Sequence, residues 1–445
     1  MAVISLGVSL LLWLNGLTES LGRPSVQNDL TLRQLELTAS VAELLPADLS
    51  AELLGPDPRQ SLSDALSTAM AQDPTPAPAL RRLELALLLR GGAHADQAER
   101  ALRELVEMVD GPRRPLVEAL LAGDRRSPLN QQALVTPWRA PLLVRQLSCE
   151  QLGGPERECP IQQARLIVLS QWLAATVLPL VLLGLGVLLI LIKLWWQLAG
   201  RIGRAPALLG PPLDLVEVTL LIAGGFVVVG EVLLPPLLAY PMQLLTTTLP
   251  PGLAQGLQVL LPYLVVMAAP LLILRSQLRP QGSTGTDGGL QWRWRPLGQA
   301  LLQALSGVLT IFPIVALAGW LIERFWGNPG GSNPLLDLVL TRSQPLTLIC
   351  FALTAVVIAP LFEETLFRGV LLPVLGQRIG PVAGVVVSAL VFAIAHLSLS
   401  ELAPLFLLGV GLGWIRWRSG RLAPSVLMHA LWNGITFIDL LALAG

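Results

Sequence analysis

This 445-residue sequence has few charged residues, only three histidines and a single lysine. Charged residues make up 13% of the chain, and 30 bases balance 30 acids, so the formal net charge is zero. Because a neutral chain has no basic excess to attract phosphates or acidic surfaces, neither a nucleic-acid partner nor an acidic partner is indicated. The basic residues other than Lys193 are all arginine, which we interpret as a coding bias of a prokaryotic source rather than as a functional feature.

Three hydrolase signatures are missing from the sequence. There is no His-Glu-x-x-His pair for a zinc site and no Gly-x-Ser-x-Gly around a nucleophilic serine. The Gly-x-Gly-Asp signature of an aspartyl pair is missing as well, because the nearest sequence, Gly-Thr-Asp-Gly at 285–288, lies in a polar loop. Any hydrolytic chemistry must therefore come from other residues.

The three cysteines do not form a metal-binding pattern. Cys350 lies within an apolar run and is expected to be a small core residue. Cys149 and Cys159 flank a polar stretch, and they can bridge if they face an oxidising compartment. Two free thiols are the alternative, and the sequence leaves both open.

Apolar residues are abundant but unevenly distributed along the chain, whose mean hydropathy is +0.64. From about residue 164 onward, apolar runs recur at about the 20-residue length that a bilayer requires. The sequence predicts an all-α, polytopic transmembrane helix bundle of about eight core spans with a soluble helical N-terminal domain. The predicted spans are 166–194, 214–239, 257–275, 299–322, 345–366, 381–397, 402–416 and 424–443.

These patterns divide the chain into four segments. They are 1–17, an N-terminal apolar anchor or signal-like segment; 18–160, a soluble helical domain; 161–344, N-terminal membrane spans; and 345–445, a C-terminal membrane domain. The run 2–14 is short for a span, and because no small-x-small cleavage site follows it, we favour an anchor. Within the soluble domain, the amphipathic stretches 79–89 and 95–109 predict a helical hairpin, and Ser40 predicts another helix start.

The loops between the predicted spans alternate in charge. Arginine and lysine follow the first and third spans, lie between the fifth and sixth, and lie between the seventh and eighth, whereas the intervening loops have no positive excess. By the positive-inside rule the basic loops face the cytoplasm. We therefore expect an integral, multi-pass protein of the plasma membrane or an internal membrane of a prokaryote, with the N-terminal domain on the non-cytoplasmic side.

Two acids and a base interrupt the apolar sequence at Glu363, Glu364 and Arg368. Each charge at the centre of a bilayer costs roughly 3 kcal/mol before pairing. Arg368 follows Glu364 by four residues, so the two can pair on one helix face. Glu363 then points elsewhere, rotated by about 100°. Pro360 either disrupts the preceding turn or starts a new one, and a helix restarted there would place Glu363 near its amino end.

Two of the three histidines lie in the same apolar third of the chain. His396 and His429 follow the glutamate pair, and Asn433 is four residues after His429, on the same helix face. A carboxylate and an imidazole can together activate a water molecule. A second imidazole and an amide can donate hydrogen bonds to an oxyanion. These residue types suffice for amide hydrolysis without a serine or cysteine nucleophile.

At these residues the sequence resembles the CPBP family, which comprises CAAX prenyl proteases and bacteriocin-processing or immunity-related (Abi) membrane proteins. The resemblance covers about residues 345–440 and rests on three motifs in order: Glu363-Glu364-Thr-Leu-Phe-Arg368, Phe392-Ala-Ile-Ala-His396 and His429-Ala-Leu-Trp-Asn433. It implies an intramembrane glutamic endopeptidase with Glu363 as base, His396 as its water-positioning partner, and His429 with Asn433 as oxyanion stabilisers. Glu364, Arg368 and Phe392 would be supporting residues.

The resemblance leaves two questions open. The family has also been regarded as metal-dependent, so a zinc ion bound by Glu363, His396 and His429 is the alternative to our expectation of no cofactor. His396 lies some 15 residues, or roughly 22 Å, from the basic start of its span, whereas His429 is close to a basic loop. The two can meet only if a helix is broken, tilted or begins below the membrane surface. Glu231, in an earlier span, either lines the same cavity or pairs within the bundle.

The sequence therefore predicts an endopeptidase that hydrolyses a peptide bond of a membrane-associated, including prenylated, protein by Glu/His-activated water. Its partners would be a membrane-embedded peptide or protein substrate and the lipid bilayer, with no nucleic acid. The alternative is a non-catalytic membrane protein that binds a partner or confers bacteriocin immunity and uses the polar cluster structurally. A transporter is a third hypothesis, but no pair of matching, interrupted spans supports it.

Overall fold

The structure, a computed structural model, describes residues 1–444 apart from 22–26, 73–77, 92–93, 125–127, 156–157, 202, 279–288, 327–338 and 340–343. The fold is 84% helical, and the described residues contain no strand, which confirms the predicted all-α class. The chain divides into two compact units. The N-terminal unit comprises Gln27–Pro179 with Asp439–Gly445, and the membrane unit comprises Met1–Val26 with Leu180–Ile438.

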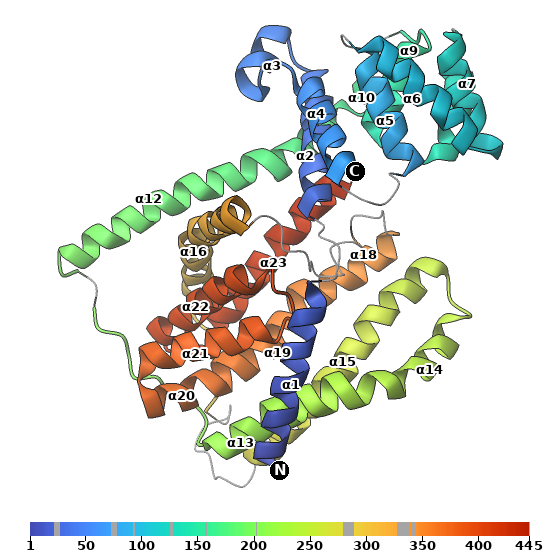
Figure 1. The fold of residues 1–445 in the computed structure, drawn as a ribbon. Coiled ribbons are helices and arrows are strands. Elements are labelled where there is room, and N and C mark those ends of the chain that lie inside the picture. The colour runs from blue at the N-terminus through green and yellow to red at the C-terminus, as the bar shows by residue number, and fades with distance from the viewer. Residues whose placement is uncertain are drawn as a thin grey trace. The chain divides into compact units, whose positions relative to one another are not determined.

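The N-terminal unit is built from short helices around one apolar core (Figure 1). Its helices are α2 (Gln27–Ala42), α3 (Ala47–Leu54), α4 (Pro58–Gln72), α5 (Ala79–Arg90), α6 (Ala95–Met108), α7 (Arg114–Ala122), α8 (Pro128–Val135), α9 (Leu142–Gln151), α10 (Pro160–Gln163) and α11 (Arg165–Trp172). The helices α5 and α6 pack against each other, so the predicted hairpin is confirmed. Leu83 and Leu87 of α5 are fully buried in this core, as expected for the apolar face of an amphipathic helix.

The predicted helix start at Ser40 is wrong. Helix α2 begins at Gln27 and ends at Ala42, so Ser40 lies in its last turn. The Ser40 hydroxyl donates a 2.9 Å hydrogen bond to the carbonyl oxygen of Glu36, one turn earlier. The side chain thus bonds back into an existing helix instead of capping a new one, which is the competing use of serine within helices.

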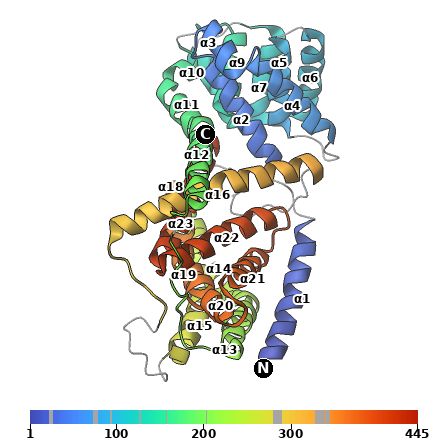
Figure 2. The same ribbon diagram turned by 90° about the vertical axis from the view of Figure 1, so that its left-hand side faces the viewer.

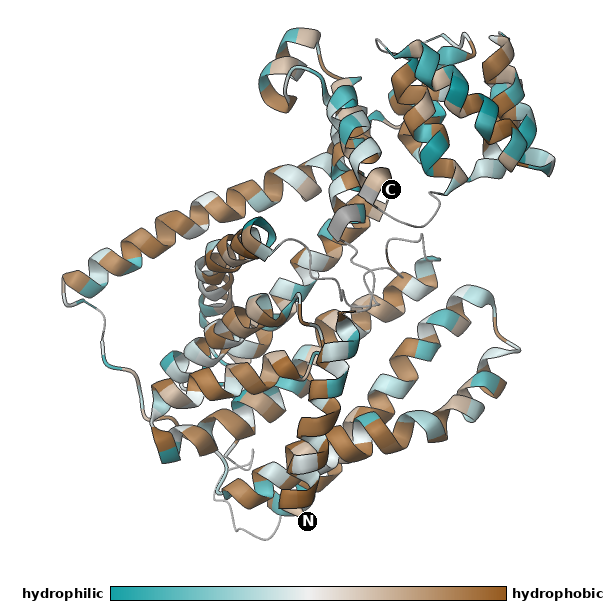
Figure 3. Cartoon of the chain, viewed as in Figure 1, coloured by the Kyte–Doolittle hydropathy of each residue, from teal (hydrophilic) through white to brown (hydrophobic). Residues whose placement is uncertain are grey.

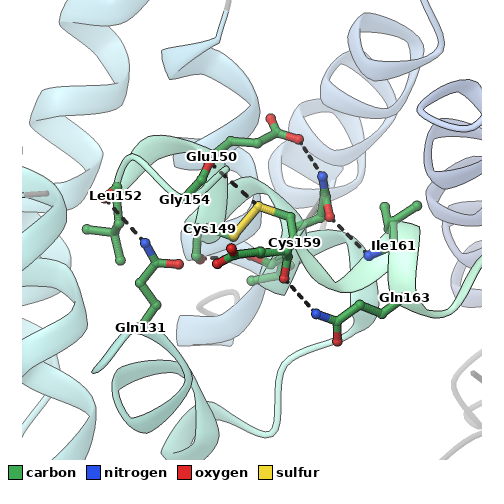
Figure 4. The surroundings of a disulfide bond; sticks show 12 residues. Gln131, Cys149, Glu150, Leu152, Gly154, Cys159, Ile161 and Gln163 are labelled. Carbon is green, nitrogen blue, oxygen red and sulfur yellow. Dashed lines mark hydrogen bonds between the residues drawn. A yellow bond between two sulfur atoms is a disulfide. The ribbon is translucent and has the colours of Figure 1, made fainter. Parts of the chain in front are cut away.

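A disulfide joins Cys149 of α9 to Cys159, just before α10, which settles the choice between a bridge and two free thiols (Figure 4). Both bridged cysteines are buried, whereas Cys350 is a free, partly buried thiol on a membrane helix. Gly154 lies against the bridge, because a Cβ atom at that position would come 2.5 Å from the Cys149 sulfur. The loop between the two cysteines therefore requires a glycine at this point.

Replacing both bridging cysteines by alanine (Cys149→Ala with Cys159→Ala) is expected to destabilise the N-terminal unit. The bridge closes a loop between positions ten residues apart, and the loss of such a constraint on the unfolded chain costs about 3 kcal/mol. Chemical unfolding of the full-length protein, followed by tryptophan fluorescence, measures the effect. Cys350→Ala is the matched control and should leave the transition unchanged; equal transitions for all three proteins would contradict the prediction.

The membrane unit contains the long apolar helices (Figure 3). Among the described residues, seven helices are long and apolar enough to cross a membrane: Ala2–Ser20, Arg165–Leu198, Leu215–Thr246, Pro251–Leu278, Leu297–Trp326, Pro345–Ile379 and Ala423–Ala444. Their parts are α1 (Ala2–Ser20), α12 (Leu178–Leu198), α13 (Leu215–Thr219), α14 (Leu234–Thr246), α15 (Pro251–Leu278), α16 (Leu297–Trp326), α18 (Pro345–Ala352), α19 (Ala359–Glu364), α20 (Leu372–Ile379) and α23 (Ala423–Ala444). The predicted polytopic membrane protein is therefore confirmed.

Two predicted spans differ from the structure. The span predicted at 381–397 is the 14-residue helix α21 (Pro381–Ile394), about 21 Å long and too short for the roughly 30 Å core of a bilayer. The span predicted at 402–416 is α22 (Leu402–Ser419), which has Arg416 and Arg418 in its last turn and is not among the seven. These two helices pack against each other, α21 also against α20 and α22 also against α16, and the opposite face of α21, with Val382, Val386 and Leu390, is exposed.

Helix α1 belongs to the membrane unit and packs against α13 and the π-helical segment η5 (Leu220–Leu233). In Figure 2 it lies at one side of that unit. Trp13 is buried in the same apolar cluster as Phe362, Phe367 and Phe392, which come from the C-terminal part of the chain. The N-terminal helix therefore contributes to the core that surrounds the polar residues.

Candidate active site

The glutamate pair lies within one uninterrupted helix, Pro345–Ile379. In this helix the α-helical parts α18, α19 and α20 alternate with two π-helical segments, η7 (Leu353–Ile358) and η8 (Thr365–Leu371). Glu363 therefore lies inside the helix, and a restart at Pro360 is wrong, whereas the other alternative, a disrupted turn before Pro360, agrees with the π-helical segment η7. A proline in a helix clashes with the carbonyl group four residues earlier. For Pro360 that carbonyl belongs to Val356 in η7, where the wider π-helical turn shifts it and the helix continues.

Glu364 is the centre of a buried hydrogen-bond network. Its side chain is fully buried, and Arg368 donates a 2.9 Å hydrogen bond to its Oε1, so the predicted pair is confirmed. Ser425 donates to Oε2 at 2.6 Å, and Nδ1 of His429 is 2.9 Å from Oε1. Three partners on one carboxylate compensate for its loss of solvent, which is the condition under which a buried charge is tolerated.

Arg368 is held by two further contacts. Its Nη2 donates a 3.1 Å hydrogen bond to the carbonyl oxygen of Gly409 on α22. Its guanidinium carbon lies 4.3 Å from the centre of the Phe392 ring, in cation–π geometry. The Glu364–Arg368 pair therefore joins the long helix to α21, α22 and α23, which makes it a structural centre of the unit.

Glu363 has a different environment from its neighbour. Its side chain is 16% exposed, and the hydroxyl of Tyr263 on α15 donates a 3.2 Å hydrogen bond to Oε1. The other oxygen, Oε2, is buried and makes no hydrogen bond to the part of the chain that the structure describes. Nε2 of His429 lies 3.9 Å from this oxygen. As predicted, Glu363 points away from the Glu364–Arg368 pair.

His429 lies between the two carboxylates. Because a carboxylate accepts hydrogen bonds, Nδ1 of His429 carries the proton that it donates to Glu364. In the neutral imidazole Nε2 is then a hydrogen-bond acceptor, and it faces Oε2 of Glu363. The site thus presents two acceptors, one carboxylate oxygen and one imidazole nitrogen, at a separation that one water molecule can bridge.

His396 lies two residues beyond the end of α21, and its Nδ1 donates a 2.8 Å hydrogen bond to the carbonyl oxygen of Phe392. The Phe392 ring contacts both imidazoles, with its centre 4.7 Å from that of His396 and 5.8 Å from that of His429. The two histidines therefore meet at Phe392, although His396 follows the far end of α21 and His429 lies in the second turn of α23 (Ala423–Ala444).

Asn433 connects α23 to the long helix. Its side-chain amide donates a 2.8 Å hydrogen bond to the carbonyl oxygen of Ala355, within the π segment η7. The amide group has a second N–H that this contact does not use. Asn433 is therefore a cross-link between helices, with one donor left for a further partner.

The structure places three contributions in the cluster that the sequence analysis did not include: Tyr263, Ser425 and the carbonyl of Gly409. A signal existed for Ser425, which precedes His429 by four residues and so lies on the same helix face. Tyr263 lies 100 residues before Glu363, so no spacing in the sequence connects the two. The chain has only two tyrosines, which is the one feature of the sequence that draws attention to it. Glu231 lies on η5 and makes no hydrogen bond with this cluster.

The zinc alternative requires Glu363, His396 and His429 to be placed around one ion. Among the residues that the structure describes, no group of three or more histidine, cysteine, aspartate or glutamate side chains is placed to hold a metal ion. His396 and His429 each use Nδ1 for a contact within the chain, with the Phe392 carbonyl and with Glu364, and such contacts are also usual for metal-bound histidines. We derive no step through a metal, and chelation tests the alternative below.

The polar cluster, except Tyr263, lies in a segment that matches a known family. Residues 345–435 match the family model of the Type II CAAX prenyl endopeptidase Rce1-like domain. The segment is an Rce1-like domain. Its first residue is the first residue of α18, and it contains all four side chains predicted as catalytic: Glu363, His396, His429 and Asn433. The Rce1-like domain thus coincides with the helices that hold Glu364 and its partners.

Three further comparisons were informative about the chain. Residues 27–167 match a domain of unknown function (DUF8675), which falls within the N-terminal unit. The chain is also 41% identical over 173 residues to the "Uncharacterized 24.3 kDa protein" of Escherichia coli, covering 37% of this chain and 72% of the relative. The chain and that protein belong to one family. No solved structure matches the chain.

Proposed function

We propose that the protein is a membrane-embedded endopeptidase in which Glu363 activates a water molecule. The observation that carries the proposal is the pair of facing acceptors, Oε2 of Glu363 and Nε2 of His429, 3.9 Å apart within an Rce1-like domain. A water molecule between them would donate one hydrogen to each, which turns its lone pairs toward an incoming carbonyl carbon. The absence of a hydrogen bond to Oε2 from the described residues supports this use of the atom.

The reaction would proceed without a covalent intermediate. Glu363 takes one proton from the water as the oxygen forms a bond to the peptide carbonyl carbon, and the carbonyl becomes an oxyanion. The second N–H of Asn433 would donate a hydrogen bond to that oxyanion, whereas the neutral His429 offers only an acceptor on this side and binds the water instead. The carbon–nitrogen bond then breaks, and the proton held by Glu363 passes to the leaving amine. His396, with Nδ1 held by the Phe392 carbonyl, would present Nε2 as an acceptor to the hydroxyl that the water leaves on the attacked carbon.

The proposed substrate is a membrane-anchored peptide or protein, including prenylated tails. Residues 345–445 would cut it, and residues 161–344 would be supporting spans.

The N-terminal unit would lie on the non-cytoplasmic side of the membrane. The disulfide supports this orientation because such bonds persist in oxidising compartments. An impermeant protease added to intact cells should remove this unit; full protection, with cleavage only after lysis, would reverse the orientation.

The proposed activity is tested with purified full-length protein in lipid nanodiscs and a set of membrane-anchored peptides, prenylated and unprenylated. Cleavage products are identified by mass spectrometry. Wild-type protein should release a product with a new carboxyl terminus, and the Glu363→Gln protein should not. Cleavage that persists at the wild-type rate in Glu363→Gln would overturn the assignment and leave the polar cluster with a structural, partner-binding role.

Exhaustive chelation is expected to leave the peptidase activity unchanged. The reason is that, in the part of the chain that the structure describes, no three histidine, cysteine, aspartate or glutamate side chains are placed to hold a metal ion. The measurement is the cleavage rate after dialysis against a strong chelator, compared with protein dialysed against buffer. A loss of activity that zinc, but not magnesium, restores would contradict the prediction.

A further inference from the structure

The chain immediately after His396 has an unusual backbone. Leu397 has a φ of +51°, a left-handed conformation that bulky L-residues seldom adopt. It lies in a turn, since its amide donates to the carbonyl of Ile394 at 3.0 Å. Such a conformation persists only where surrounding contacts hold it. The direction in which His396 leaves α21 therefore depends on what holds residues 397–399.

Helix α1 supplies the contacts that hold this turn. The amide of Leu399 donates a 3.1 Å hydrogen bond to the hydroxyl oxygen of Ser20, across 379 positions of sequence. Ser20 is fully buried, and its own hydroxyl donates to the carbonyl of Leu17, which fixes its orientation. Gly16, one turn earlier, faces the Leu397 side chain so closely that a Cβ atom there would come 2.9 Å from Cδ2.

The remainder of α1 is attached to the same unit. The hydroxyl of Ser9, which is 1% exposed, donates a 3.1 Å hydrogen bond to the carbonyl of Ala223. Trp13 packs in the apolar cluster that also contains Phe392, the residue whose ring and carbonyl contact His396. The helix is thus fixed along its length, and its carboxyl end meets the turn that follows His396.

We propose that α1 is a positioning element of the active site, in which Gly16 and Ser20 hold residues 397–399 and thereby set the orientation of the His396 imidazole. The consequence for catalysis rests on the proposed function, whereas the consequence for the imidazole does not. A segment that resembles a signal or an anchor in sequence is then a required part of the membrane unit.

The test compares Gly16→Leu with Gly7→Leu in the full-length protein. Both changes replace a glycine of the same helix by leucine, but a Cβ at position 7 meets nothing within 4 Å, whereas one at position 16 meets Leu397. Gly16→Leu should therefore lower kcat for a membrane-anchored peptide at least tenfold with an unchanged KM. Gly7→Leu should match the wild type in both constants.

An activity-independent readout separates this proposal from the proposed function. The chain has only three histidines, so ¹⁵N-histidine labelling gives three sets of imidazole signals, and a His396→Gln protein identifies one of them. Gly16→Leu should shift the His396 signals and leave those of His94 unchanged. If the wild type cleaves no peptide, the proposed function fails, yet the shift still decides whether α1 orients His396.

Ser20 provides a second pair of variants in case Gly16→Leu does not fold. Ser20→Ala removes the acceptor for the Leu399 amide, and Ser20→Thr keeps a hydroxyl at the same place. We expect the His396 signals to shift in Ser20→Ala and to return in Ser20→Thr. The proposal is overturned if Gly16→Leu and Ser20→Ala both keep the wild-type His396 signals and the wild-type kcat. If Gly16→Leu does not fold, the same result for Ser20→Ala alone overturns it.

Discussion

Arg368→Met should lower the free energy of unfolding of the protein by about 3–5 kcal/mol, because it leaves the Glu364 carboxylate buried without its charged partner. Both side chains are fully buried, and Nη1 of Arg368 is 2.9 Å from Oε1 of Glu364. The change also removes the hydrogen bond to the Gly409 carbonyl and the contact with Phe392. Thermal unfolding of the purified protein in nanodiscs, with the yield of folded protein as a second readout, measures the loss.

Arg378→Met is the matched control for this prediction. Arg378 lies on the same long helix, is exposed, and makes no ion pair with the residues that the structure describes. Its replacement should change stability by no more than about 0.5 kcal/mol, as is usual for surface substitutions. If Arg368→Met and Arg378→Met proteins unfold at the same temperature, the Glu364–Arg368 pair is not the structural centre that we describe.

Glu363→Gln should reduce the cleavage rate by a factor of about 10²–10⁴, the range over which a positioned general base contributes. Glutamine keeps the size of the side chain and can still accept the hydrogen bond from Tyr263, so the fold should not change. What it lacks is the basic oxygen that faces Nε2 of His429. Single-turnover cleavage of a membrane-anchored peptide separates this chemical step from product release.

Tyr263→Phe provides a graded control for the role of Glu363. This variant keeps the carboxylate and removes only the 3.2 Å hydrogen bond to Oε1. We expect a loss of activity of roughly tenfold or less, since one such hydrogen bond contributes about 1 kcal/mol. A loss as large as that of Glu363→Gln would indicate instead that the tyrosine hydroxyl itself takes part in the chemistry.

Features that depend on local spacing could be predicted from the sequence. The four-residue interval between Glu364 and Arg368 indicates a pair on one helix face, and the pair is present. The same interval connects His429 to Asn433, and both side chains contact the long helix or its glutamate. Apolar runs of bilayer length indicated the membrane helices. These predictions required no knowledge of how the helices pack.

Features that depend on packing between distant segments could not be predicted. A proline usually breaks a helix, but the π-helical turns before Pro360 allow this helix to continue. Tyr263 reaches Glu363 from another helix, and Ser20 reaches Leu399 from the other end of the chain. Neither pair has a spacing or composition that marks it in the sequence. The meeting of His396 and His429 at Phe392 likewise depends on how α21 and α23 pack, which the sequence does not show.

We propose that two adjacent carboxylates have separate roles: Glu363 acts on water, and Glu364 holds the helices together. The most direct test measures both the unfolding temperature and the single-turnover cleavage rate of Glu363→Gln and Glu364→Gln. The structure predicts that Glu363→Gln unfolds at the wild-type temperature and has lost cleavage, whereas Glu364→Gln unfolds at a clearly lower temperature. A Glu363→Gln protein that is as destabilised as Glu364→Gln, with its folded fraction cleaving at the wild-type rate, would contradict the claim.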